Sequence, residues 1–163
     1  MVCEVKLVNK RIIIIAIICL IVDQVSKIFA SMFLTLNASK VLIKNFFNLS
    51  LCHNYGVAFG MLGDHRVLIF LFTAIAIAII IKFMYSFKTS LLNNVAFGLL
   101  VGGLVGNLLD RLVFGYVRDF FDFIIFNYDF PVFNVADICI VIGVFLLCIA
   151  VLKGEEKNGS SSK

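Results

Sequence analysis

Four long apolar runs constrain this chain more than any other feature of its sequence. They cover residues 12–30, 67–87, 91–112 and 132–152. A helix needs about 20 residues to cross the hydrocarbon core of a bilayer, which is roughly 30 Å thick. Because backbone polar groups cannot stay unpaired in lipid, such runs predict membrane-spanning helices. Hydrophobic residues make up 62% of the 163-residue chain, so the predicted fold is an all-α polytopic membrane protein with four transmembrane helices.

One of the connections between these runs carries a strand pattern. Apolar and polar residues partly alternate from Phe46 to His53, and the Asn54-Tyr55-Gly56 that follows is a turn signal. This pattern predicts a small β or loop segment on the outer surface, between the first and second helices. We expect residues 1–153 to form a single membrane-embedded domain, and the hydrophilic residues 154–163, with their serine run, to form a disordered cytoplasmic tail.

The amino-terminal charges predict the orientation of the chain. Lys6, Lys10 and Arg11 precede the first apolar run, and basic residues beside a span favour the cytoplasmic side. An even number of spans then places both termini in the cytoplasm. This region resembles a secretory signal, but no small-x-small cleavage site follows, and Asp23 and Lys27 interrupt the run. We therefore expect a retained first helix.

Four polar residues inside the apolar runs fall at a similar predicted depth. At about 1.5 Å per residue, Asp23 lies roughly 18 Å and Asp137 roughly 24 Å from the cytoplasmic edge. Asn107 and Asp110 lie roughly 26 to 30 Å from the same edge. Polar groups in a bilayer are costly unless they face a partner or a water-filled cavity, so the set predicts a functional site in the outer half of the membrane. For each residue alone, structural pairing with a neighbouring helix is the alternative.

Two of these acids have candidate partners close by in the sequence. Asp23 and Lys27 are spaced i, i+4 in the favourable order, which predicts an ion pair on one face of the first helix. Asp110 is followed directly by Arg111, and Asn107 lies one turn earlier. We expect these three residues to form a second polar cluster.

Asp137, and a further acid, Asp119, have no cation three or four residues away on a predicted helix, although Arg118 adjoins Asp119. If Asp119 lies just above the third span and Asp137 near the top of the fourth, the hairpin between these spans brings the two carboxylates face to face. Two such carboxylates cannot both ionise readily, so one keeps a proton and the pair can deprotonate a water molecule. This arrangement predicts peptide-bond hydrolysis by general acid and base catalysis.

Other function classes also fit parts of the pattern. A small ion channel or proton-coupled transporter uses intramembrane acids, but it predicts polar residues at several depths rather than in one half. A metal-dependent lipid transferase is suggested by Asp119-x-x-Asp122, although two acids one helical turn apart are weak grounds for a magnesium site. A membrane-embedded scaffold is compatible with the composition. No basic aromatic patch suggests a nucleic-acid partner.

Five short motifs, in order along the chain, resemble lipoprotein signal peptidase, also called signal peptidase II. They are Asp23-Gln24-Val25-Ser26-Lys27, Asn54-Tyr55-Gly56-Val57-Ala58-Phe59, Gly106-Asn107-Leu108-Leu109-Asp110-Arg111, Val117-Arg118-Asp119-Phe120 and Phe133-Asn134-Val135-Ala136-Asp137. The resemblance extends from about the first span to the last and includes the four-span layout. One departure is Arg118, where the family leads us to expect an aliphatic residue.

The resemblance implies an aspartic endopeptidase of the bacterial cytoplasmic membrane. Such an enzyme removes the signal peptide from prolipoproteins by cutting before a cysteine that carries a diacylglyceryl group. By motif, the catalytic pair falls on Asp119 and Asp137. The remaining motif positions would line the substrate groove or support the pair, and they are Asp23, Lys27, Asn54, Gly56, Asn107, Asp110, Arg111, Asn134 and Ala136.

The same resemblance predicts the partners and setting of the chain. We expect lipid-modified prolipoproteins and membrane lipids as partners, with no nucleic acid. No metal and no other cofactor is expected. The chain is expected to act as a monomer, with its active site near the outer face of the inner membrane and both termini in the cytoplasm.

Overall fold

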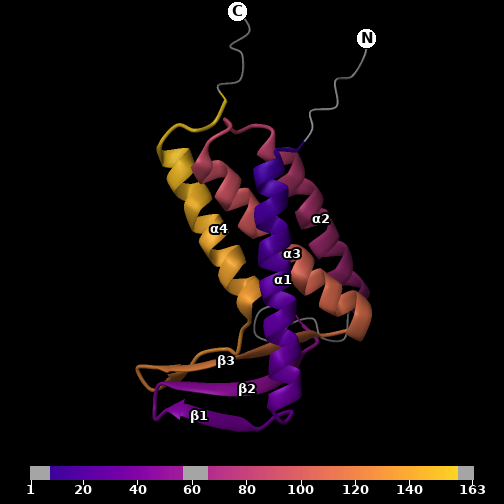
Figure 1. Ribbon diagram of the computed structural model, residues 1–163, viewed down its shortest axis with the longest axis vertical. Coiled ribbons are helices and arrows are strands. Elements are labelled where there is room, and N and C mark those ends of the chain that lie inside the picture. Colours follow the sequence, from indigo (N-terminus) through magenta and orange to yellow (C-terminus); the bar gives the residue numbers. More distant parts are fainter. Residues whose placement is uncertain (1–7, 57–65, 158–163) are drawn as a thin grey trace, which may run out of the picture.

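A helical bundle with a small sheet across one end makes up the fold (Figure 1). The computed structural model describes residues 8–56 and 66–157, and for residues 66–68 the backbone only. The helices are α1 (Lys10–Phe33), α2 (Arg66–Met84), α3 (Leu91–Phe114) and α4 (Val135–Leu152). The strands are β1 (Ser39–Ile43), β2 (Phe47–Asn54), β3 (Val117–Ile125) and β4 (Tyr128–Asp129).

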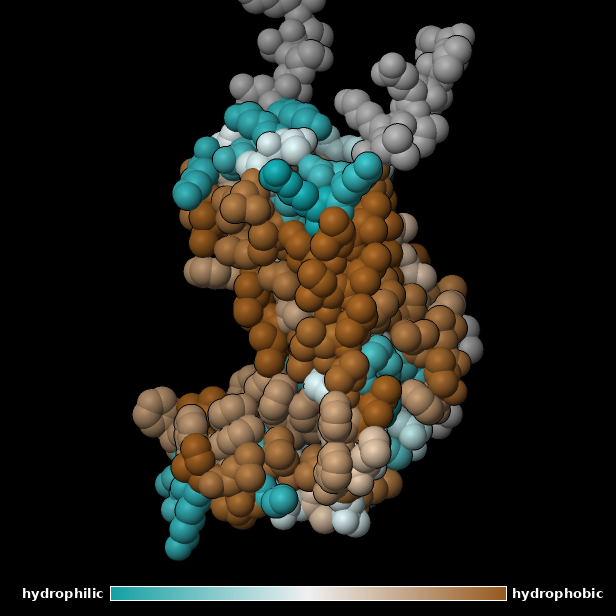
Figure 2. Space-filling view, in the orientation of Figure 1, coloured by the Kyte–Doolittle hydropathy of each residue, from teal (hydrophilic) through white to brown (hydrophobic). Residues whose placement is uncertain are grey.

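The helices form the most apolar part of the protein. Their sides present a continuous apolar surface, and a hydrophilic cap covers the end of the bundle away from the sheet (Figure 2). Among the described residues, α1, α3 and α4 are long and apolar enough to cross a membrane, whereas Ile69–Met84 of α2 is a shorter apolar helix. The length and composition of the described helices therefore support three spans, and the fourth predicted span is not established.

Small residues of α3 allow the neighbouring helices to approach it closely. A Cβ atom on Gly102 would lie 2.7 Å from the carbonyl oxygen of Ala16 in α1. On Gly103 it would lie 2.5 Å from the carbonyl oxygen of Ala136 in α4. Close helix contacts of this kind replace the hydrophobic driving force that lipid removes. They bring the polar residues of α1, α3 and α4 within hydrogen-bonding reach.

The sheet is antiparallel throughout, in the order β1-β2-β3-β4. The β1–β2 hairpin confirms the strand predicted between the first two helices. The all-α assignment is wrong in one respect, because the connection between α3 and α4 adds β3 and β4 to the same sheet. Cys52 of β2 lies opposite Asp119 of β3. This pairing joins segments that are distant in the sequence, and a local pattern does not reveal it.

The segment after α4 is ordered at its start, where a disordered tail was predicted. The backbone N–H of Lys88 donates to the carbonyl of Glu155, at 2.8 Å, and that of Lys157 donates to the carbonyl of Ser86, also at 2.8 Å. Residues 154–157 thus pair with the link between α2 and α3, and α2 ends at Met84 rather than at residue 87. Residues 158–163 lie outside the described part of the chain.

Candidate active site

Two helix ends position the carboxylates of Asp119 and Asp137. The chain leaves α3 at Gly115, whose φ of 80° is left-handed and suits glycine, and it enters β3 two residues later. Asp137 lies in the first turn of α4, where Asn134 is the N-cap. The Asn134 side chain accepts from the backbone N–H of Asp137, and the Asp137 carboxylate accepts from the backbone N–H of Asn134. This reciprocal capping box fixes the Asp137 side chain and starts α4 at residue 135 rather than 132.

Asn134 also links the two carboxylates. Its side-chain Nδ2 donates to Oδ1 of Asp119 at 2.6 Å, while its backbone N–H donates to Oδ2 of Asp137 at 3.1 Å. The two acids therefore share one hydrogen-bond partner, while the face-to-face contact of their carboxylates stays a prediction. The shared partner results from a strand that lies beside a helix N-terminus rather than from a simple helical hairpin.

Two further asparagines occupy the remaining carboxylate oxygens. Asn54 of β2 donates through Nδ2 to Oδ2 of Asp119 at 2.9 Å, and Asn107 of α3 donates through Nδ2 to Oδ1 of Asp137 at 2.8 Å. Each of the four oxygens thus accepts one amide hydrogen bond. Neutral donors orient the carboxylates without holding both of them in the charged form as a cation would.

Asp119 is almost completely buried, with 3% of its surface exposed. Burial, and then the nearby negative charge of Asp137, raise the pKa of Asp119 to about 7, against the opposing hydrogen bonds from Asn54 and Asn134. A carboxyl group with such a pKa carries a proton in part of the population near neutral pH. The pair can therefore present one proton donor and one proton acceptor to a substrate.

Lys27 connects this site to the first helix. Its Nζ lies 2.9 Å from Oδ2 of Asp23 and 3.5 Å from Oδ2 of Asp110, and all three side chains are fully buried. The predicted Asp23–Lys27 ion pair is confirmed. Lys27 also donates to Oδ1 of Asn107 at 2.9 Å, which orients the amide that holds Asp137.

Asp23 has a second contact that positions the start of α4. Its Oδ1 accepts from the backbone N–H of Ala136 at 2.9 Å. A Cβ atom on Gly106 would lie 2.5 Å from Oδ2 of Asp23, so this glycine leaves room for the carboxylate. The small residues of the motifs thus serve the polar network through their backbones.

The prediction that Arg111 is the partner of Asp110 is wrong. Adjacent residues on a helix do not face each other. The Arg111 guanidinium instead donates to the carbonyl oxygens of Asn107 and Gly56, at 3.3 and 3.1 Å. Gly56 in turn donates its N–H to Oδ1 of Asn54, so Arg111 anchors the end of β2 that carries Asn54.

Arg118 is the partner that Asp110 has in the structure. It donates from Nη2 to Oδ1 at 2.7 Å and from Nε to Oδ2 at 3.2 Å, and its guanidinium lies 4.5 Å from the centroid of the Phe114 ring. Successive strand residues point to opposite sides, so Arg118 faces Asp110 while Asp119 faces Asn134. Its charge is therefore neutralised on the far side of the strand from Asp119.

Replacing Arg118 with leucine should destabilise the protein by about 3 kcal/mol, because it removes one partner of a buried ion pair. Lysine at this position should recover only part of the loss, since it cannot make the two-pronged contact. Unfolding midpoints of the purified wild type, Arg118→Leu and Arg118→Lys measure this order. Equal stability of all three would contradict the role assigned to the Arg118–Asp110 pair.

Asp122 does not join the candidate site. Asp119 and Asp122 do not form the metal pair that their spacing suggests, because both lie on β3, where residues three apart point to opposite faces. The Asp122 carboxylate accepts from Ser50 at 2.6 Å and Asn48 at 3.3 Å. The carboxylates of Asp119 and Asp122 therefore do not converge on a magnesium site.

Gln24 is a member of the network that sequence reasoning missed. Its Nε2 lies 3.0 Å from Oδ2 of Asp23 and 3.1 Å from Oδ1 of Asp110, and its Oε1 accepts from Arg118. It therefore links the ion pairs of α1 and α3. Its position inside an apolar run, next to Asp23, was the available signal.

The structure joins all the remaining residues selected from the sequence. Asp23, Lys27, Asn54, Gly56, Asn107, Asp110, Arg111, Asp119, Asn134, Ala136 and Asp137 form one connected set of hydrogen bonds and ion pairs. They come from β2, β3, three helices, the turn after β2 and the N-cap of α4. The similar predicted depth of four of them reflected a real cluster.

Known proteins resemble this chain in sequence and in fold. Lipoprotein signal peptidase of Symbiobacterium thermophilum is 40% identical over 147 residues, which are 90% of this chain and 97% of the relative. That of Staphylococcus aureus is 39% identical over 142 residues, which are 86% and 87% of the two chains.

Two solved structures, described as bacterial membrane enzymes determined by the in meso method, share the fold. One superposes with a TM-score of 0.78 at 35% identity and covers 93% of both chains. The other has a TM-score of 0.76 at 38% identity and covers 87% of this chain and 92% of its own. The sequence profile described as Signal peptidase (SPase) II matches residues 15–153, and the chain therefore belongs to the signal peptidase II family of membrane peptidases.

Proposed function

We propose that this protein removes signal peptides from bacterial prolipoproteins, cutting before a cysteine that carries a diacylglyceryl group. Asp119 and Asp137 are the catalytic pair of this proposal, and the protein acts as a monomer on lipid-modified substrates. The observation that carries the proposal is the shared hydrogen bonding of both carboxylates to Asn134. The names of the relatives, all lipoprotein signal peptidases, support the substrate class.

The proposed chemistry needs one protonated and one ionised carboxyl group. The ionised group takes a proton from a water molecule, whose oxygen attacks the scissile carbonyl carbon. The protonated group donates to the carbonyl oxygen as the tetrahedral intermediate forms. Collapse of this intermediate breaks the C–N bond, the amine of the modified cysteine gains a proton, and the signal peptide leaves with a new carboxylate. The raised pKa of Asp119, about 7, supports it as the protonated member.

The proposed location of this chemistry is the outer face of the bacterial inner membrane. Three described apolar helices, and the acids near the sheet end of the bundle, support this placement. The basic residues at the other end favour the cytoplasm for both termini. A substrate held by its signal helix and acyl chains then presents the bond before its cysteine at the depth of the pair.

Cleavage should depend on pH through the proton on Asp119. Because its pKa is raised to about 7, the pair holds the needed proton below that pH and loses it above. We expect kcat/KM to fall as pH rises past about 7, with an apparent pKa that belongs to the pair. A rate profile from about pH 5 to about pH 9 measures this. A rate that keeps rising to the alkaline end would contradict the assignment of the proton.

A purified-enzyme assay tests the substrate and the cleavage site. The full chain, in detergent or nanodiscs, is given a prolipoprotein with or without its diacylglyceryl group, and mass spectrometry identifies the products. We expect cleavage of the lipidated form only, directly before the modified cysteine, and undiminished cleavage in a metal chelator. Equal cleavage of both forms, or loss of cleavage in the chelator, would refute the proposal as stated.

A further inference from the structure

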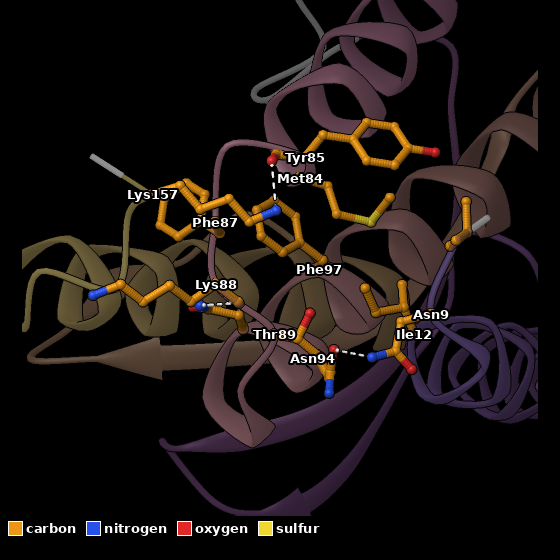
Figure 3. Close-up of a pocket in the computed structure, with 12 residues that line it drawn as sticks. Asn9, Ile12, Met84, Tyr85, Phe87, Lys88, Thr89, Asn94, Phe97 and Lys157 are labelled. Atoms are coloured by element: carbon orange, nitrogen blue, oxygen red, sulfur yellow. Dashed lines mark hydrogen bonds between the residues drawn. The ribbon is translucent and has the colours of Figure 1, made fainter. Parts of the chain in front are cut away.

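A polar pocket lies at the opposite end of the bundle from the candidate active site. It has a volume of about 300 Å³ and lies between the start of α1, the end of α2 and the start of α3 (Figure 3). Its lining includes the polar residues Asn9, Tyr85, Lys88, Thr89, Asn93, Asn94 and Lys157. None of these residues contributes to the hydrogen bonds around Asp119 and Asp137 described above.

Two buried amides in this pocket have hydrogen-bonding capacity to spare. Asn93 and Asn94 are each only 2% exposed. Asn93 donates from Nδ2 to the carbonyl of Lys88 and, at 3.4 Å, to the carboxylate of Glu155, and Asn94 accepts at Oδ1 from Asn9. Within the described chain, however, Oδ1 of Asn93 and Nδ2 of Asn94 have no hydrogen-bond partner. Unpaired buried polar atoms are unfavourable, so the pocket suits a ligand that offers both an acceptor and a donor.

Two ammonium groups give the pocket a positive charge. Lys88 Nζ donates to the carbonyl of Gly154 at 2.8 Å, and Lys157 Nζ donates to that of Tyr85 at 2.9 Å. An ammonium group has three donors, so Lys157 can also bind an anion, whereas the Lys88 ammonium extends away from Asn94 (Figure 3). Among the described residues, this end of the bundle carries six cations and two carboxylates, namely Lys10, Arg11, Lys82, Lys88, Lys153 and Lys157 against Glu155 and Glu156. The balance favours an anionic ligand.

An apolar groove continues from the pocket along the bundle. The two hollows share Val8, Ile12 and Met84, and the groove of about 290 Å³ has no polar surface. Its far end on α3 is Val105, eleven residues beyond Asn94, which corresponds to about 16 Å along a helix. Half of a hydrocarbon core is about 15 Å thick. The groove therefore matches one acyl chain in one leaflet.

We propose that this pocket and groove bind one molecule of an anionic phospholipid with a phosphate and a hydroxyl-bearing headgroup, of the phosphatidylglycerol type. The phosphate accepts from Lys157 and Nδ2 of Asn94, Lys88 adds its positive charge without touching the lipid, and a headgroup hydroxyl donates to Oδ1 of Asn93. One acyl chain lies in the groove between α1, α2 and α3. This inference does not rest on the proposed peptidase function, because it uses the other end of the molecule.

Native mass spectrometry of the purified full chain tests this binding with phosphatidylglycerol and phosphatidylcholine as probes. We expect the wild type to retain phosphatidylglycerol preferentially. Each lysine near an anionic lipid contributes about fivefold, so Lys88→Gln/Lys157→Gln should bind phosphatidylglycerol about 25-fold more weakly. The matched control, Lys40→Gln/Lys44→Gln at the sheet end, should bind like the wild type. Equal binding of the two lipids by the wild type, or unchanged binding by the first double variant, would overturn the proposal.

A second variant separates lipid binding from simple anion binding. Val105→Trp fills the far end of the groove but leaves the polar pocket intact, so it should weaken phosphatidylglycerol binding, and soluble glycerol 3-phosphate should not displace the lipid from the wild type. Displacement by glycerol 3-phosphate, or full binding by Val105→Trp, would mean that the pocket recognises a headgroup alone and would refute the lipid site. The Val105→Trp and glycerol 3-phosphate experiments test the lipid site even if the lysine double variant does not fold.

Discussion

Replacement of Asp119 or Asp137 with asparagine is expected to lower the rate of prolipoprotein cleavage by about 10³-fold or more. Asparagine keeps the size of the side chain and one acceptor oxygen, but it can neither take a proton from water nor hold the shared proton. Because the two carboxylates act as one unit, the double variant should be little worse than either single variant. Single-turnover cleavage of a lipidated prolipoprotein measures the effect.

Asp122→Asn is the matched control for this pair of variants. Asp122 lies on the same strand as Asp119, but it accepts from Ser50 and Asn48 on the other face. We expect it to retain most of the wild-type rate. Near wild-type cleavage by Asp119→Asn or Asp137→Asn would show that the replaced residue is not catalytic. A folded but inactive Asp122→Asn would show that Asp122 belongs to the catalytic pair.

Lys27→Met is expected to destabilise the protein by about 3 to 5 kcal/mol, the largest stability loss predicted for a single substitution here. Lys27 neutralises Asp23 and Asp110, and both carboxylates are fully buried. Methionine would fill much of the space and leave two acids without this cation. Unfolding midpoints in detergent measure the loss, and Lys40→Met, at an exposed position of β1, should change stability by less than about 0.5 kcal/mol.

Asp23→Ala provides a graded comparison with Lys27→Met. It should cost less, because Lys27 keeps Asp110 at 3.5 Å as a partner. It also leaves the backbone N–H of Ala136, at the start of α4, without the Asp23 carboxylate as its acceptor. Both substrate placement and stability should therefore be impaired. A greater stability loss from Asp23→Ala than from Lys27→Met would contradict the central position assigned to Lys27.

The part of the site that lies on helices could be predicted from the sequence. Asp23 and Lys27 obey an i, i+4 rule, and depth along a span depends only on the rise per residue. The apolar runs themselves identified the helices, although averages of hydropathy do not locate helix ends. The capping box of Asn134 and Asp137 begins α4 three residues later than the apolar run.

The part of the site that depends on the sheet could not be predicted in the same way. Asp119 lies on β3, which pairs with β2. Because α2 and α3 separate these two strands in the sequence, no local periodicity indicates that they pair. Arg118 adjoins Asp119 in the sequence, yet the alternation of the strand turns it toward Asp110. The predicted pairing of Asp110 with Arg111 is wrong because adjacent residues on a helix do not face each other.

An experimental structure with an uncleavable substrate analogue tests the catalytic pair most directly. The analogue is a lipidated lipobox peptide in which a hydroxyl-bearing tetrahedral carbon replaces the scissile carbonyl. We expect its hydroxyl oxygen to lie within about 3 Å of a carboxylate oxygen of Asp119 and of one of Asp137, as a transition-state mimic should. A hydroxyl bound to only one of the two carboxylates, or bound away from both, would contradict a shared role in activating water.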